Sequence, residues 1–190
     1  MILFGIFCSE ALADHGWYIK GSGGASLLDD ATFSGGGQSR DVSFDTGLAL
    51  AGTAGYDFEG FRIEAELGLR ENEVNAVDGV NADGSLTTSS LLVNALYDFE
   101  NSSRWTPYLG AGLGGADIFA NEITLGSQVL DDDQIVFAYQ LKAGIGYDLG
   151  KDMALSLDYS YFTADDPQFN GVNAEYKNHT LAFGLNFALN

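Results

Sequence analysis

Apolar and polar residues alternate with a period of two along most of this chain. In residues 153–161 the odd positions are Met, Leu, Leu, Tyr and Tyr, whereas the even positions are Ala, Ser, Asp and Ser. Residues 180–189 carry Leu or Phe at every odd position. A period of two indicates β-strands with one apolar face, because an amphipathic helix repeats every 3.6 residues. The pattern predicts eight strands, at residues 17–28, 44–58, 61–70, 86–99, 105–119, 137–149, 153–161 and 180–189.

The connections between these segments alternate between short and long. Residues 59–60, 100–104 and 150–152 are short connections, whereas the long ones are residues 29–43, 71–85, 120–136 and 162–179. Short turns at one end and long loops at the other are typical of barrels in bacterial outer membranes. The sequence therefore predicts an all-β fold, a single eight-stranded antiparallel up-and-down transmembrane β-barrel.

Aromatic residues gather at both ends of the predicted strands. Rings of this kind concentrate at the headgroup level of a bilayer. Two girdles around an aliphatic band are therefore expected, and a soluble barrel with core aromatics would not produce this clustering. The short-turn girdle comprises Trp17, Tyr18, Tyr56, Phe58, Phe61, Tyr97, Phe99, Trp105, Tyr108, Tyr147 and Phe187. The loop-side girdle comprises Phe44, Phe119, Phe137, Tyr139, Tyr161 and Tyr176.

Charge and the N-terminal segment narrow the class of protein. The 190 residues include 27 acidic and 8 basic side chains, so the net charge of −19 argues against a nucleic-acid partner. No run of about 18 apolar residues is present, so no transmembrane helix is expected. Residues 2–7 are apolar, and Ala11-Leu12-Ala13 has the small-x-small form of a cleavage site. We expect a signal peptide over residues 1–13 and a barrel domain over residues 14–190.

Several segments, taken in their order along the chain, resemble a known family. They are Gly55-Tyr56-Asp57-Phe58, residues 61–66, residues 94–99, residues 105–114, residues 139–144 and residues 157–161. Together they resemble the OmpA-like and opacity-protein-like small outer membrane β-barrels, a family of bacterial surface antigens and porin-like barrel domains. The resemblance implies an eight-stranded up-and-down barrel with both termini in the periplasm.

The polar face of the predicted strands carries charges of both signs. Side chains fill the interior of an eight-stranded barrel, and buried charges must be paired or hydrated. We expect a structural charge network that closes the lumen, and the alternative is a gated path for small solutes or ions. The predicted network comprises Arg62, Glu64, Glu66, Arg70, Lys142 and Asp158.

No catalytic, cofactor or metal site is predicted. The acidic pairs and triplet at residues 29–30, 131–133 and 165–166 lack the spacing of a calcium-binding loop. A lipid deacylase with His179 as its base would need a nucleophile nearby on the same face, and the position two residues on is Leu181. Gly110, Gly112 and Gly114 alternate along a strand with no helix after them, so they are expected to be small inward residues rather than a nucleotide-binding loop.

The sequence therefore predicts a non-enzymatic outer membrane protein with a structural and surface-exposed role. Its expected partners are outer membrane lipids and lipopolysaccharide, and a protein that binds the long external loops. A narrow porin-like channel and an accessory subunit of a larger outer membrane complex remain as alternatives.

Overall fold

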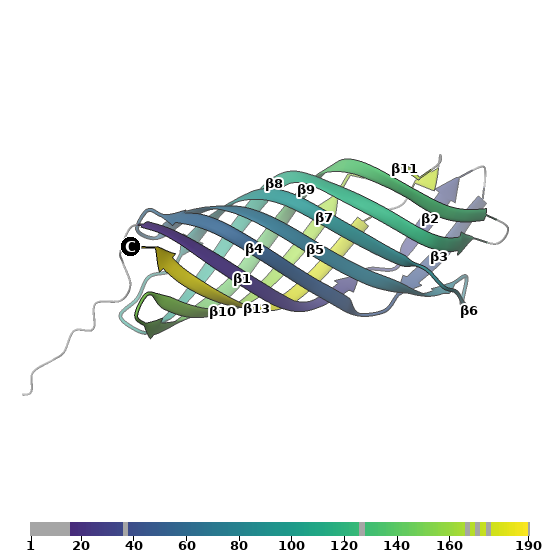
Figure 1. Ribbon diagram of the computed structural model, residues 1–190. Helices are drawn as coiled ribbons and strands as arrows, with labels where there is room; N and C mark the ends of the chain where they lie inside the picture. The colour runs from purple at the N-terminus through teal and green to yellow at the C-terminus, as the bar shows by residue number, and fades with distance from the viewer. Residues whose placement is uncertain are drawn as a thin grey trace, which may run out of the picture.

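The computed structural model describes residues 16–35, 38–125, 128–165, 168–169, 172–173 and 176–189. The expected signal segment, residues 1–13, lies outside the described residues. The regular structure of the described part is entirely β, and its long strands form one closed, tilted barrel (Figure 1). Among these residues, no helix is long and apolar enough to cross a membrane.

Eight antiparallel strands form the barrel wall. Each strand pairs with the next one around the wall, and β13 pairs with β1 to close it. A closed wall leaves no unpaired backbone edge, which is what a strand protein needs in a medium without water. The eight strands are β1 (Gly16–Leu28), β4 (Gly47–Asp57), β5 (Phe61–Val77), β7 (Ser85–Asp98), β8 (Trp105–Leu125), β9 (Gln128–Gly150), β10 (Met153–Ala164) and β13 (Tyr176–Leu189).

All eight predicted strands are confirmed, but several boundaries are wrong. The segment predicted at residues 44–58 is interrupted at Asp45 and Thr46, so Phe44 belongs to a separate strand. Strands β5, β8 and β9 continue far into segments that were predicted to be loops. In β5, Glu71 and Glu73 point outward, whereas Val74 and Ala76 are buried. The polarity of the two faces is inverted there, because the wall has left the apolar medium and encloses a dry core.

The described loop segments add more β-structure to the end of the barrel opposite the C-terminus (Figure 1). Strands β2 (Ala31–Gly35) and β3 (Gln38–Phe44) form a hairpin, and β3 pairs with β5. The short strands β6 (Val80–Asn81), β11 (Gln168–Phe169) and β12 (Val172–Asn173) complete the extension. Arg40 Nη1 lies 2.5 Å from Asp78 Oδ2, and this hydrogen bond lowers the pKa of Asp78 below its usual range.

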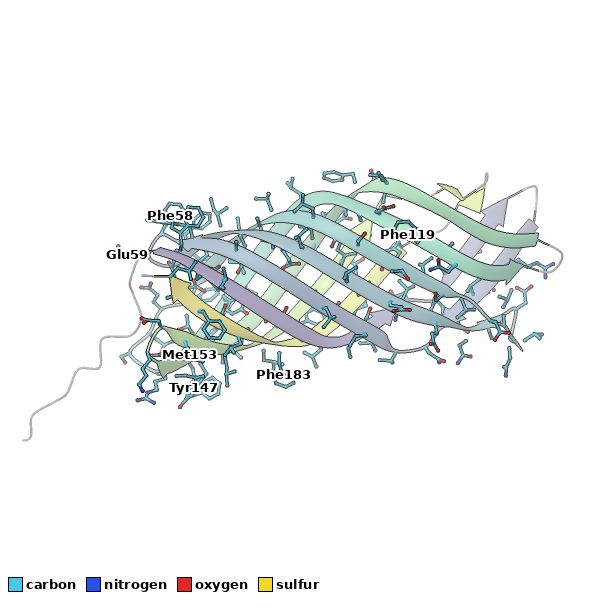
Figure 2. The ribbon with its side chains drawn as sticks, viewed as in Figure 1. Phe58, Glu59, Phe119, Tyr147, Met153 and Phe183 are labelled. Carbon is cyan, nitrogen blue, oxygen red and sulfur yellow. The ribbon has the colours of Figure 1, made fainter. Side chains whose placement is uncertain are left out.

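The outer face of the barrel is apolar over most of its height. Leu67, Leu113 and Phe183 are 65%, 59% and 72% exposed, and their neighbours on this face are similar. Figure 2 shows Phe183 pointing away from the barrel. A continuous apolar surface of this extent is not stable in water, so the surrounding medium is lipid.

The aromatic girdles are only partly as predicted. Trp17 packs edge-on against Tyr56 at 5.3 Å, and Trp105 packs against Tyr147 at 4.5 Å, so the short-turn girdle is present. The assignments of Tyr18, Tyr108, Tyr176 and Phe44 to girdles are wrong. The three tyrosines are buried inside the barrel, and Phe44 packs against the interior core. Tyr18, Tyr108 and Tyr176 occupy even positions of β1, β8 and β13, which face the lumen in those strands. A position near a strand end does not determine which face a ring takes.

An apolar cluster, here called the loop-side core, fills the interior toward the long loops. Phe162, Leu92 and Ile118 have no exposed surface. The hydroxyl of Tyr176 accepts a hydrogen bond from Thr88 Oγ1 at 2.9 Å, so the polar atom of this ring is also satisfied. The core comprises Leu28, Ala31, Val42, Val74, Val77, Leu86, Leu92, Ala116, Ile118, Ala120, Ala138, Phe162, Ala164 and Tyr176.

Inward-facing glycines make room for the rings inside the barrel, and this gives a testable prediction. A Cβ atom at Gly144 would overlap the ring of Tyr108, whereas a Cβ atom at the outward-facing Gly52 would meet nothing within 4 Å. Gly144→Ala is expected to lower the free energy of unfolding by about 1–3 kcal/mol through overpacking. Gly52→Ala should be close to neutral. Urea titration of both variants in the same detergent measures the difference, and equal effects would contradict the inward packing.

Candidate functional site

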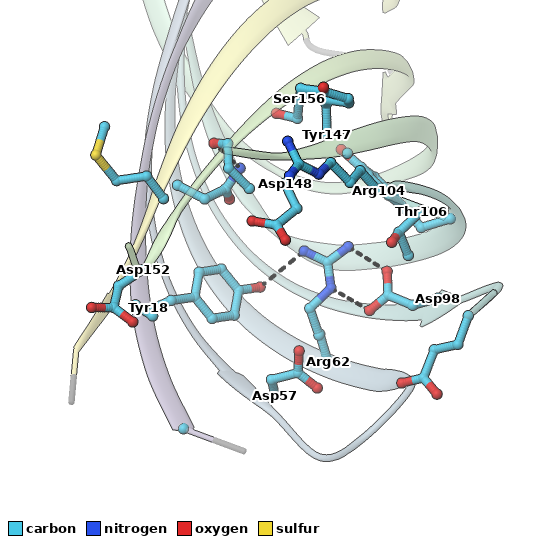
Figure 3. A pocket seen from close by; sticks show the side chains of 18 of the residues that line it. Tyr18, Asp57, Arg62, Asp98, Arg104, Thr106, Tyr147, Asp148, Asp152 and Ser156 are labelled. Atoms are coloured by element: carbon cyan, nitrogen blue, oxygen red, sulfur yellow. Dashed lines mark hydrogen bonds and ion pairs between the residues drawn. The ribbon is translucent and has the colours of Figure 1, made fainter. Parts of the chain in front are cut away.

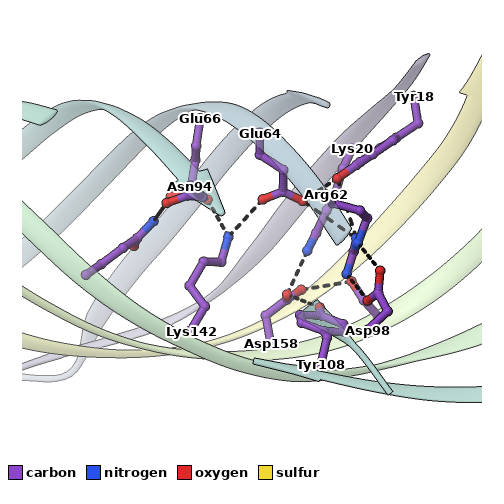
Figure 4. Close-up of polar contacts among 12 residues, drawn as sticks. Tyr18, Lys20, Arg62, Glu64, Glu66, Asn94, Asp98, Tyr108, Lys142 and Asp158 are labelled. Atoms are coloured by element: carbon purple, nitrogen blue, oxygen red, sulfur yellow. Dashed lines mark hydrogen bonds and ion pairs between the residues drawn. The ribbon is translucent and has the colours of Figure 1, made fainter. Parts of the chain in front are cut away.

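The predicted lumen residues all lie on the inner face of the wall. Arg62, Glu64, Glu66 and Arg70 occupy even positions of β5, and successive strand residues alternate between the two faces. Lys142 comes from β9 and Asp158 from β10. Figure 4 shows Arg62, Glu64, Glu66, Lys142 and Asp158 close together between the strands.

The part of the network nearest the short turns is centred on Arg62. Its Nε and Nη2 donate to the two carboxylate oxygens of Asp98, both at 2.7 Å. The Tyr18 hydroxyl donates to Glu64 Oε1 at 2.7 Å, and Arg62 Nη1 lies 3.7 Å from the same oxygen. The guanidinium carbon of Arg62 lies 4.7 Å from the centroid of the Tyr108 ring. Arg62 is thus held by a bidentate ion pair and an aromatic face, an arrangement that restricts its geometry.

Asp158 organises the second part of the network. Lys20 Nζ lies 2.7 Å from Asp158 Oδ1. Ser156 Oγ donates to Asp158 Oδ2 at 2.8 Å, and the Tyr108 hydroxyl donates to Asp158 Oδ1. The carboxylate therefore has a cationic partner and two neutral donors, which is the satisfaction that a buried charge requires.

Glu66 organises the third part. Lys142 Nζ lies 2.5 Å from Glu66 Oε2 and 3.6 Å from Glu64 Oε2, so one ammonium group serves two carboxylates. Gln140 Nε2 donates to Glu66 Oε1 at 3.0 Å, and Asn94 Nδ2 donates to Glu66 Oε2 at 3.3 Å. The residues linked by these contacts are here called the lumen network: Tyr18, Lys20, Arg62, Glu64, Glu66, Asn94, Asp98, Tyr108, Gln140, Lys142, Ser156 and Asp158.

The structure brings together five of the six predicted residues and leaves one apart. Arg70 is buried. Its Nη1 donates to Ser90 Oγ at 3.2 Å, and its guanidinium carbon lies 4.3 Å from the centroid of the Phe162 ring. Among the described residues, Arg70 makes no ion pair with a carboxylate. The prediction omitted Lys20 and Asp98, although their even positions place both on the inner face.

Water can reach one side of the lumen network. A cavity of about 250 Å³ lies on its short-turn side, lined by Arg62 and Asp98 and by Asp57, Arg104 and Asp148 (Figure 3). We call it the short-turn cavity. On the other side of the network lies the loop-side core. The interior therefore consists of a polar cavity, a layer of paired charges and a layer of packed apolar side chains. Ser26, Asn72 and Asn178 form a buried hydrogen-bonded cluster next to that last layer.

The histidine considered for catalysis lies outside the barrel wall. His179 Nδ1 is 2.7 Å from the Tyr159 hydroxyl, and His179 Nε2 is 3.6 Å from Asp29 Oδ1. Leu181, the next residue on that face, is 49% exposed and offers no nucleophile. Within the described part of the chain, no three His, Cys, Asp or Glu side chains are arranged to hold a metal ion. The side chains of residues 131–133 and 166 lie outside the described residues.

Proteins of similar sequence include an outer membrane protein and a putative adhesin. Outer membrane protein PagN of Salmonella typhimurium strain LT2 is 28% identical over 192 residues, which cover 82% of this chain and 77% of that protein. A putative adhesin of Rickettsia bellii is 21% identical, over 90% of this chain and 87% of that protein.

Two solved structures share the fold. Neisserial surface protein A superposes with a TM-score of 0.61 at 21% identity, over 92% of this chain and 97% of that one. The outer membrane protein OprG from Pseudomonas aeruginosa superposes with a TM-score of 0.60 at 15% identity, over 95% of this chain and 100% of that one. The family model for the outer membrane protein beta-barrel domain matches residues 1–188. This chain therefore belongs to the outer membrane protein β-barrel domain family, and its location is the outer membrane.

Proposed function

We propose that this protein is a non-enzymatic, closed outer membrane barrel with a structural and surface-exposed role. The observation that carries the proposal is the filled interior: the lumen network and the loop-side core follow one another along the axis. Charged groups that are paired in this way stabilise the barrel without offering a continuous water path. The barrel then acts as a membrane anchor for the wall extension on the loop side, with the short turns in the periplasm.

The loop-side surface supports a role in interaction. Exposed carboxylates on it include Asp29, Asp30, Asp41, Asp45, Glu71, Glu73, Asp78 and Asp83. The basic residues described in the same region are Arg40 and Lys177. A surface of this charge favours a partner with positive charge, or lipopolysaccharide phosphates bridged by divalent cations. Gentle detergent extraction from cells, followed by identification of the proteins that co-purify, tests this role. Co-purification of another outer membrane protein in stoichiometric amount would instead favour the alternative that this chain is an accessory subunit of a larger complex.

Conductance tests the closed lumen. Purified protein in planar bilayers is expected to show currents near background, with a general porin as the positive control. We also expect Arg62→Ala to remain closed. The reason is that the loop-side core remains in place in this variant. If charges alone sealed the lumen, the loss of Arg62 would instead open a leak. Large and steady single-channel currents from the unmodified protein would favour the pore alternative.

A further inference from the structure

A groove crosses the outer face of the barrel wall from β4 to β9, with a volume of about 670 Å³. The outward-facing residues that line it are paired in register across the strands, in two adjacent rows. Small residues stand among leucines in these rows, so the surface is hollowed where a large side chain is missing. The first row is Leu50, Leu69, Ser89, Asp117 and Ile135, and the second row is Gly52, Leu67, Leu91 and Gly115.

The groove runs obliquely through the lipid-facing part of the wall. Gly52 lies five residues from the short-turn end of β4 at Asp57, whereas Asp117 lies twelve residues from the short-turn end of β8 at Trp105. The β8 end of the groove is therefore the end nearer the loops and the headgroups. Four intervals between neighbouring strands give a length of roughly 19 Å. One leaflet of hydrocarbon is about 15 Å thick, so the groove has the length of one tilted acyl chain.

Asp117 marks the headgroup end of the groove. Of the described residues that line the groove, it alone carries a charge. Its Oδ1 atom is enclosed and has no hydrogen-bond partner among the described residues. Its register partners, Ser89 and Ile135, are uncharged. An enclosed carboxylate oxygen without a donor is unfavourable, so this position favours a ligand that brings a cationic N–H group.

We propose that the groove binds one phospholipid with a primary ammonium headgroup, of which phosphatidylethanolamine is the common bacterial example. One acyl chain lies between the two rows, and the ammonium group donates a hydrogen bond to Asp117. A primary ammonium has three N–H donors and a positive charge, whereas phosphatidylcholine has the same net charge and no N–H donor. The site lies on the outside of the wall, so it depends neither on the closed lumen nor on a partner at the loops.

Quenching by brominated lipids tests the proposal in a bilayer. Phe137→Trp supplies a reporter in register with Gly115, and Trp17→Phe and Trp105→Phe remove the other tryptophans. The full chain is refolded into phosphatidylcholine vesicles that contain equal fractions of either brominated phosphatidylethanolamine or brominated phosphatidylcholine. The relative binding constant is expected to favour phosphatidylethanolamine by about two- to fivefold, the effect of one partly exposed charge pair. Equal quenching by the two lipids would overturn the proposal.

Matched variants separate the headgroup contact from the groove. Asp117→Asn removes the charge and should bring the preference to unity, whereas Glu71→Gln neutralises another outward carboxylate and should keep it. Gly115→Leu fills the groove and leaves Asp117 in place, and an added Cβ atom there meets only Val136 O at 3.9 Å. It should also abolish the preference. A preference that survives in Asp117→Asn or in Gly115→Leu would contradict the site as described.

Native mass spectrometry of the unmodified protein gives a second readout that needs no reporter. Protein released from an equimolar mixture of the two lipids is expected to retain one phosphatidylethanolamine molecule in preference to phosphatidylcholine. Equal retention of both lipids would count against the proposal. Quenching by both lipids that falls as the protein-to-lipid ratio rises would show a second copy of the chain on the groove, and would also overturn it.

Discussion

Leu157→Arg is expected to lower the free energy of unfolding by about 2–4 kcal/mol, the cost of a cation on the lipid face of a barrel at mid-membrane depth. Leu157 lies in the middle of β10, points outward, and has Ile145 and Phe183 as its partners on the adjoining strands. An arginine there would meet acyl chains with no acidic neighbour. Urea unfolding of the protein in lipid vesicles measures the loss.

Two controls separate membrane depth from general damage to the strand. Leu157→Val keeps the position apolar and should change the stability little. Ile135→Arg introduces the same charge toward the loops, where Ile135 is 80% exposed and is paired in register with Asp117. Asp117 Oδ1 has no hydrogen-bond partner among the described residues, so the new cation should be neutral or stabilising. Equal losses of unfolding free energy in the two arginine variants would show that Ile135 also faces lipid, which would contradict the boundary inferred here.

Lys142→Ala should be as damaging as any single change inside the barrel. It removes the ammonium group that serves Glu64 and Glu66, which are 1% and 4% exposed. A buried carboxylate that loses its partner typically costs about 3–5 kcal/mol. Arg62→Ala should cost less, because water in the short-turn cavity can hydrate Asp98.

A double-mutant cycle checks the reason for that loss. Lys142→Met combined with Glu66→Gln removes both charges of the closest pair, so the double variant should be more stable than the sum of the single effects. Arg104→Ala serves as the exposed control and should be near neutral. It is preferable to Lys151→Ala, because Lys151 already has a φ of 56°, so any change at this position acts on a strained turn. Additive effects of the pair would mean that the two charges do not support one another.

Much of the fold could be predicted because a lipid-facing strand has a simple signature. Residues 153–161 and 180–189 place large apolar side chains at odd positions, and the structure turns those positions outward. The signature fails where the wall leaves the lipid. In β5 the outward residues become Glu71 and Glu73, whereas Val74 joins the loop-side core. A search for apolar outward positions therefore ends the strand too early.

The lumen site was predictable residue by residue but not pair by pair. Even positions correctly placed Arg62, Glu64 and Glu66 inside. The partners are far apart in the chain, as in Lys20 and Asp158, which are 138 residues apart. Which inward side chains meet depends on the tilt and stagger of the closed barrel, and the period of a single strand does not contain that information. The inward tyrosines, Tyr18 and Tyr108, were misplaced for a related reason, since aromatic residues suit both the headgroup region and a polar interior.

Water access to two interior positions tests the closed lumen most directly. Thr106 faces the short-turn cavity, whereas Thr88 has no exposed surface and lies beside the loop-side core. In a Cys8→Ser background, a small charged thiol reagent added to the folded barrel should label Thr106→Cys readily and leave Thr88→Cys unlabelled until the barrel is unfolded. Rapid labelling of both cysteines in the folded protein would show a water-filled lumen and contradict the account.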